Sequence, residues 1–132
     1  MCDSKRDIGQ KAPRAFRLSR RADIDKVFAD GATARDSLAI MIGRPNGLGR
    51  SRFGVGVSRR HGNAVARNRV KRLCREAMRL SRPELPVGWD IMLLPKAGAK
   101  LSLSALRQAV VSLGRRLVDR AQAGGGPRGR RR

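Results

Sequence analysis

The residues with the clearest chemical potential form a basic cluster in the middle of the chain. Between Arg59 and Arg82 the sequence has nine Lys or Arg residues and a single acid, Glu76. Guanidinium groups bind phosphate oxygens through paired hydrogen bonds and also stack on bases. The basic residues are Arg59, Arg60, Arg67, Arg69, Lys71, Arg72, Arg75, Arg79 and Arg82. The chemistry that this cluster predicts is phosphate binding.

Side chains for catalysis by the protein itself are not gathered in the sequence. His61 is the single histidine, and no Ser-His-Asp or Cys-His set can be assembled around it. Asp23 and Asp25 point to different faces of a helix, as solvated charges do. A protein-only nuclease generally needs carboxylates or histidines that hold metal ions. We therefore expect no catalytic residue and no metal ligand in the protein, and His61 in a loop. Cys2 and Cys74 are expected to be reduced thiols.

The periodicity of apolar residues predicts the elements that position the basic cluster. Asn63–Leu80 has the stripe of a helix that Asn63 caps, and a last helix starts at Ser102. An earlier helix is expected over Ser19–Gly31, with Ser19 as its cap and Gly31 in a left-handed turn. The two stripes are Ala66, Val70, Leu73, Ala77 and Leu80, then Leu106, Val110, Leu113 and Leu117. Strands are expected at Ser37–Ile42, Arg52–Ser58 and Asp90–Leu94.

This order of elements indicates an α/β sandwich, with one small sheet and helices packed on it. Residues 1–14 and 122–132 have too little apolar character to join a core. We expect a disordered basic leader and a disordered Gly/Arg-rich tail on either side of one RNA-binding domain at 15–121.

The outer face of the central helix is expected to be strongly cationic. On a helical wheel Asn68, Lys71, Arg72, Arg75 and Arg79 lie opposite the apolar stripe, and Arg67 and Arg69 flank it. A solvated charged face usually mixes signs along the helix, whereas this one has almost no acid. A bound polyanion would relieve that repulsion.

The overall charge indicates that the polyanion is a nucleic acid. The chain has 31 Lys and Arg against 10 Asp and Glu, a net charge of +21. No apolar run approaches the ~20 residues of a membrane span, and no signal peptide is visible, so we expect a cytoplasmic protein without a membrane partner. The central helix fits no common DNA-binding motif, and aromatic residues are few, so DNA is not expected. Recognition of structured RNA by shape and phosphate is favoured.

The segment from Phe53 to Arg79 resembles the bacterial ribonuclease P protein component. The core of the likeness is Gly62, Asn63, Ala64, Val65, then Arg67, Asn68, Arg69, Lys71, Arg72, Arg75 and Glu76 at their observed spacing. The resemblance extends over roughly Phe16–Ala121. It implies a mixed sheet of about four strands with three helices, in the order αββ(β)αβα, and a left-handed βαβ crossover against the usual rule.

The resemblance also implies a function. The protein would be a subunit of the ribonucleoprotein endoribonuclease that removes the 5′ leader of precursor tRNA. Hydrolysis would be performed by the ribonuclease P RNA with Mg²⁺ held mainly by that RNA, the protein alone being a monomer that binds no cofactor. Contacts to the RNA subunit would come from Arg67, Asn68, Arg69, Lys71, Arg72 and Arg75. A cleft for the single-stranded leader would be lined or flanked by Phe16, Arg17, Phe28, Ser58 and Arg60.

Three positions depart from the family pattern. Ile24 and Met41 stand where the family often has an aromatic residue, and Gly56 stands where it often has serine. Leader binding is therefore expected to depend more on shape and charge than on stacking. Two other functions stay open: a purely structural RNA binder, such as a ribosomal protein or assembly factor, and a protein-only nuclease.

Overall fold

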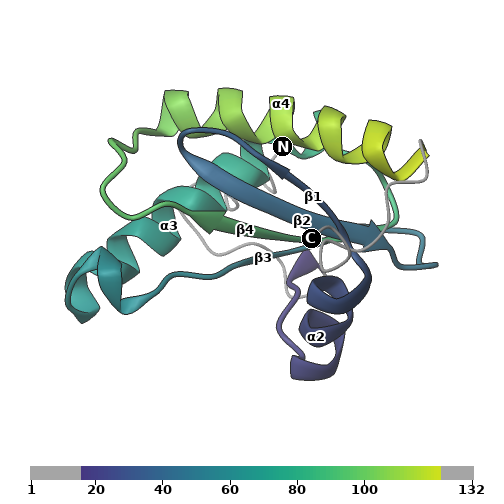
Figure 1. Ribbon diagram of the computed structural model, residues 1–132, viewed down its shortest axis with the longest axis horizontal. Helices are drawn as coiled ribbons and strands as arrows, with labels where there is room; N and C mark the ends of the chain where they lie inside the picture. The colour runs from purple at the N-terminus through teal and green to yellow at the C-terminus, as the bar shows by residue number, and fades with distance from the viewer. Residues whose placement is uncertain (1–15, 123–132) are drawn as a thin grey trace, which may run out of the picture.

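Four strands and three helices follow one another in residues 16–122, the part of the chain that the computed structural model describes (Figure 1). The helices are α2 (Arg21–Asp30), α3 (Ala64–Ser81) and α4 (Leu103–Gln122). The strands are β1 (Ala32–Arg35), β2 (Ala39–Pro45), β3 (Arg52–Val55) and β4 (Trp89–Pro95). Short 3₁₀ turns, η2 (Arg59–His61) and η3 (Arg82–Glu84), stand on either side of α3.

The sheet is mixed, with the strand order β1-β2-β4-β3. β2 pairs antiparallel with β1 and with β4, whereas β3 runs parallel to β4 and is connected to it through α3. The expected α+β fold with about four strands is therefore confirmed, and β1 is the additional strand between the first helix and β2. The left-handed crossover stays a prediction.

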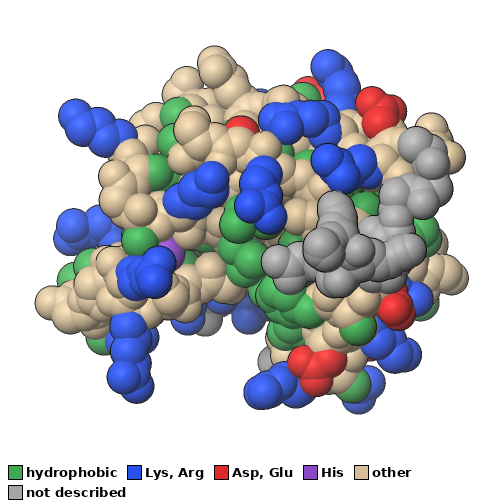
Figure 2. Space-filling view, viewed as in Figure 1, with side chains coloured by type: hydrophobic (Ala, Val, Ile, Leu, Met, Phe, Trp, Pro, Cys, Tyr) green, Lys and Arg blue, Asp and Glu red, His purple; other side chains and the backbone are tan. Residues whose placement is uncertain are grey.

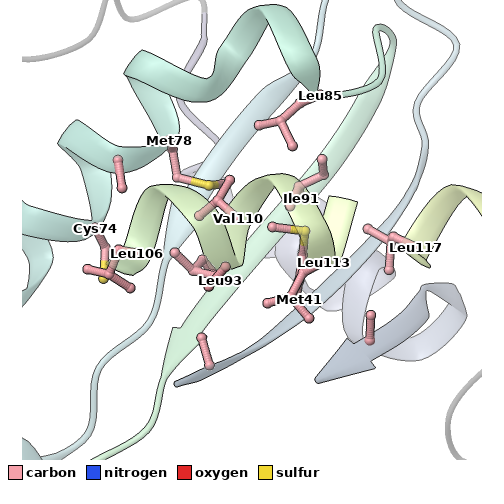
Figure 3. Close-up of a cluster of buried hydrophobic side chains, with 14 of the residues drawn as sticks. Met41, Cys74, Met78, Leu85, Ile91, Leu93, Leu106, Val110, Leu113 and Leu117 are labelled. Carbon is pink, nitrogen blue, oxygen red and sulfur yellow. The ribbon is translucent and has the colours of Figure 1, made fainter. Parts of the chain in front are cut away.

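Helices cover both faces of the sheet (Figure 1). α3 and α4 pack on one face, where alternate strand residues such as Met41, Ile91 and Leu93 are fully buried (Figure 3). α2 packs on the other face, where Val27 contacts a smaller cluster that includes Ile42. β4 is covered on both sides, which explains its nearly continuous apolar sequence.

The two long helices have the predicted caps, and α4 also has the predicted buried stripe. Asn63 caps α3 by accepting a hydrogen bond from the backbone N–H of Ala66 at 2.9 Å, and the Ser102 hydroxyl accepts one from Ala105 at 3.1 Å at the start of α4. All four residues of the predicted α4 stripe are buried. In α3 the buried face is rotated from the predicted stripe, because its last turns bury Met78 and Ser81 instead of Leu80.

The first helix begins and ends differently from the prediction. Arg20, not Ser19, occupies the N-cap position, and no side chain caps α2. Gly31 does end the helix, but its φ of −76° is not left-handed. A Cβ at this position would lie 2.5 Å from the carbonyl oxygen of Val27 and 2.8 Å from Ile42 Cγ2. Close packing on β2 therefore accounts for the glycine.

The first predicted strand is displaced along the chain, and the second starts as predicted but is shorter. β2 starts at Ala39 because the Asp36 carboxylate accepts hydrogen bonds from the N–H groups of Leu38 and Ala39, which forms a turn. β3 ends at Val55, although the N–H of Gly56 still donates to Leu93. The predicted disordered leader at 1–14 lies outside the described residues, as does almost all of the predicted tail at 122–132.

Candidate nucleic-acid interface

The outer face of α3 presents the basic side chains predicted for it. Asn68, Arg69, Arg72 and Arg75 are exposed, and Arg67 and Lys71 are half-buried at its borders. Within residues 16–122 no acid forms an ion pair with any of the five cations in this set. The apolar side of the same helix is buried in the main core, so the helix cannot turn this face inward. We call these six residues the α3 basic surface.

Arg79 does not belong to this surface, which corrects the helical-wheel prediction. Its guanidinium donates two hydrogen bonds to the Glu76 carboxylate, at 3.2 and 2.6 Å. The two residues are three positions apart on one helix, a spacing that brings side chains together. The charge of Arg79 is thus compensated within the protein, unlike the charges of the α3 basic surface.

The turn before α3 holds the predicted cleft residues Ser58 and Arg60. The Ser58 hydroxyl accepts a hydrogen bond from the Arg60 backbone N–H at 3.3 Å, and the Ser58 N–H donates to His61 Nδ1 at 3.3 Å. These two contacts form a capping box, and they leave the side chains of both Ser58 and Arg60 exposed. His61 lies in this turn rather than in an irregular loop. A capping box usually has Glu or Gln three residues after the serine, so histidine at that position gave no clear sequence signal for it.

Phe16 and Arg17 lie beside β3, and Arg17 pairs with it. Arg17 forms a bridge with Phe53, and the N–H of Leu18 donates to the Phe53 carbonyl at 2.8 Å. The guanidinium of Arg82 stacks over the Phe16 ring, 4.2 Å from its centre. A small pocket between this segment, β3 and α3 is lined by Phe16, Arg17, Phe53, Val55, Arg75, Met78, Arg79 and Arg82. Phe16 and Arg17 therefore adjoin the α3 basic surface.

Phe28 lies apart from Phe16 and Arg17, on the opposite face of the sheet. It is half-buried on α2 beside Ile24 and packs against the cluster of Leu18, Val27, Ile42 and Met92. Ile40 and Leu94 continue this apolar surface along the strands. Figure 2 shows the molecule indented between α2 and the segment leading into α3, with apolar side chains along the indentation. The predicted cleft residues are thus spread over α2, the turn before α3 and the segment beside the edge strand β3, not in a single pocket.

A partly buried ionic cluster that links α2 to β3 and β4 was not predicted from the sequence. Arg52 on β3 and Asp90 on β4 face each other in the parallel register, and Arg52 donates from Nε and Nη2 to the two Asp90 oxygens at 2.8 and 2.7 Å. Asn46 adds a hydrogen bond to Asp90 at 2.8 Å. The third guanidinium nitrogen, Nη1, lies 3.3 Å from Asp23 of α2. Asp23 is therefore not the solvated charge that the sequence indicated.

Burial and hydrogen bonding shift the pKa values of Asp90 and Arg52 in opposite directions. Burial alone would raise the pKa of Asp90, but the hydrogen bonds from Arg52 and Asn46, together with the positive charges of Arg52 and Arg44, outweigh it, so the pKa is lowered. The hydrogen bond to Asp90 raises the pKa of Arg52, and this effect is larger than the lowering of the pKa by burial. Both groups therefore stay ionised at neutral pH.

Groups that could perform covalent or metal chemistry are not assembled in the described part of the chain. In residues 16–122 no three His, Cys, Asp or Glu side chains lie close enough together to hold a metal ion. Cys74 is fully buried in the main core, and burial raises the pKa of its thiol to about 12. As predicted, it acts as a small apolar residue. No helix in the described residues is long and apolar enough to cross a membrane.

Comparisons with known proteins agree on one family. The family model described as Ribonuclease P matches residues 12–118. A protein named ribonuclease P protein component from Dehalococcoides mccartyi is 41% identical over 106 residues, 80% of this chain and 84% of the relative. One of the same name from Brevibacillus brevis is 33% identical, covering 78% and 83%. The solved ribonuclease P protein from Thermotoga maritima superposes with a TM-score of 0.69 at 30% identity, over 76% of this chain and 96% of that one.

Proposed function

The chain belongs to the ribonuclease P protein family, and on that premise we propose that it binds a ribonuclease P RNA and the 5′ leader of precursor tRNA. Membership implies a part in tRNA 5′ processing within an endoribonuclease. The proposal adds which surfaces of this protein make the RNA contacts and which partner performs the chemistry.

The observation that carries the proposal is the uncompensated charge of the α3 basic surface. Five cations occupy one side of a helix whose other side is fixed in the core, and none has an acidic partner in residues 16–122. Like charges three or four positions apart destabilise a helix. Phosphate oxygens of a folded RNA would remove that cost. Asn68, which lies among the five cations, can bind a 2′-hydroxyl or a base edge. We assign the RNA subunit to this surface.

The leader is assigned to the indentation between α2 and the turn before α3. Phe28 and the apolar strand residues near it offer a surface for bases, and Ser58 and Arg60 stand exposed at its other side. Phe16 and Arg17 would contact nucleotides closer to α3. The contacts would accept different leader sequences, because shape, apolar contact and charge do not read base edges.

Hydrolysis is assigned to the RNA subunit rather than to protein side chains. The carboxylates and the histidine of residues 16–122 do not form a metal-binding group, and both Asp23 and Asp90 are used in ion pairs with Arg52. The catalytic Mg²⁺ would accordingly be bound mainly by RNA. A protein-only nuclease is the less favoured alternative for the same reason.

The test compares cleavage of a precursor tRNA at low Mg²⁺ by a bacterial ribonuclease P RNA alone, by that RNA with the purified chain, and by the chain alone. We expect the chain to stimulate the RNA and to be inactive by itself. The same chain, assembled with the RNA, should bind precursor tRNA more tightly than leaderless tRNA. Equal affinities would favour a purely structural RNA binder, and cleavage by the chain alone would favour a nuclease.

A further inference from the structure

α2 is held on the sheet by apolar contact and by one charged contact. Val27 is fully buried against the sheet, near the C-terminal end of this ten-residue helix. Nearer its start, Asp23 Oδ2 lies 3.3 Å from Arg52 Nη1, the one ion pair between α2 and a strand within residues 16–122. Helices of this length are marginal by themselves in water, so tertiary contacts must fix their place.

The cation in this contact is fixed before α2 reaches it. Two of the nitrogens of Arg52 are bound to the two oxygens of Asp90, whose side chain is only 4% exposed. That bidentate contact sets the plane of the guanidinium and points Nη1 toward α2. Asp23 therefore meets a cation that has already lost its freedom to rotate, which lowers the entropic cost of pairing.

The ion pair also lies close to the surface assigned to the leader. Asp23 and Phe28 are on the same short helix, and Phe28 is part of the apolar cluster that continues along β2 and β4. A displacement of the start of α2 would move this wall relative to the strands. α2 has no side-chain cap at its N-terminus that could hold the first turn in another way.

We propose that Asp23 is a positioning residue, which docks α2 on the sheet through Arg52 and thereby fixes the leader-binding wall. The proposal rests on the leader contact proposed above. Asp23 itself is not assigned a contact with RNA. Its effect would come from the fraction of molecules in which α2 is docked before the leader binds.

Asp23→Asn and Asp25→Asn form a matched pair for the test. Each change adds the same charge to the same helix, but within residues 16–122 Asp25 pairs only with the exposed Arg21 of α2, at 3.6 Å. Added positive charge alone would strengthen RNA binding in both variants. Loss of docking would weaken leader binding in the Asp23 variant alone, so the two explanations predict changes of opposite sign.

The measured quantity is the ratio of the Kd values for leaderless and leader-bearing tRNA, each bound to the holoenzyme. Asp23→Asn is expected to reduce this ratio by about two- to fivefold, the equivalent of a partly exposed ion pair. Asp25→Asn should leave it within about 1.5-fold on the same scale. Asp23→Glu, which keeps the charge, should restore most of the ratio. Affinity for the RNA subunit should change equally in the two Asn variants.

Hydrogen exchange of the free protein separates docking from RNA binding. Amides of α2 should exchange faster in Asp23→Asn than in Asp25→Asn, while those of α3 and α4 are unchanged. Equal exchange in α2, or an unchanged ratio of Kd values, would overturn the proposal. A parent chain that does not discriminate leader-bearing from leaderless tRNA would refute the proposed leader contact instead, and the exchange data would still decide whether the ion pair docks α2.

Discussion

Replacing two exposed arginines of the α3 basic surface tests whether this surface binds phosphate. Arg69 and Arg72 are exposed and have no acidic partner in the described residues. Their change to Ala should weaken binding of the RNA subunit and flatten its dependence on salt. The matched control is Arg107→Ala with Arg115→Ala, which removes two exposed cations from α4.

The magnitude follows from the two phosphate groups that the double variant would leave unbound. Each neutralised phosphate contributes about 0.9 to the slope of log K against log salt on duplex nucleic acid, so two contribute about 1.8. Between 50 and 200 mM salt, the advantage of the parent over the double variant should therefore shrink by about tenfold. The α4 control should keep most of the parent slope.

Stability should change in the opposite direction from binding. Arg72 lies three residues from Arg69 and from Arg75, so the double variant removes two like-charge repulsions. Each is worth about 0.2–0.5 kcal/mol, and we expect Tm to stay level or to rise by a few degrees.

Binding is measured by fluorescence anisotropy of labelled RNA subunit at several salt concentrations and constant Mg²⁺, and Tm by circular dichroism. An unchanged slope in the double variant, or an equal change in the α4 control, would refute the assignment of the RNA subunit to α3. A fall in Tm would show that the two arginines support the fold.

Three further outcomes are expected. Asp90→Asn leaves Arg52 without its bidentate partner and should destabilise the protein by about 2–4 kcal/mol, measured by urea unfolding with Asp119→Asn as the exposed control. Because the pKa of Asp90 is lower in the folded state, the ionised carboxylate stabilises the fold above its unfolded pKa of about 3.9, and this stabilisation is lost as the pH falls below that value. The free energy of unfolding of the Asp90→Asn variant should therefore fall less steeply with acid than that of the parent. Ser81→Ala should raise stability by about 1 kcal/mol in the same assay, because the Ser81 hydroxyl is buried and has no hydrogen-bond partner among the described residues, and a destabilised variant would contradict this. Cys74, with a pKa of about 12, should resist iodoacetamide at pH 8 until urea unfolds the protein; peptide mapping that finds it modified in the native state would show the site to be open.

Local pattern was enough to predict the elements that bury a regular stripe. α3 and α4 have recognisable caps, Asn63 and Ser102, and apolar residues at helical spacing, so the extent of α3, the start of α4 and the buried stripe of α4 followed. β1 has the sequence Ala-Thr-Ala-Arg, which is short and contains no large apolar residue, so it had no comparable signal. Its existence depends on pairing with β2.

Contacts between residues far apart in the sequence could not be predicted from the local sequence pattern. Arg52 and Asp90 become neighbours only because β3 and β4 pair in parallel with those two residues in register. Asp23 joins them from a third element, so its role could not be inferred from its position on α2. The pairing of Arg79 with Glu76 was different, because their spacing alone allowed it to be foreseen.

The place of β4 in the sheet has a consequence for synthesis of the chain. β4 lies between β2 and β3, yet it is the last strand to leave the ribosome. Until Pro95 has been made, β2 and β3 have no common neighbour, and the face of the sheet on which α3 packs is incomplete. The basic helix α3 is therefore synthesised before β4, the strand that joins the two parts of the sheet. We expect the nascent protein to complete its fold only in a late step, when β4 inserts between β2 and β3.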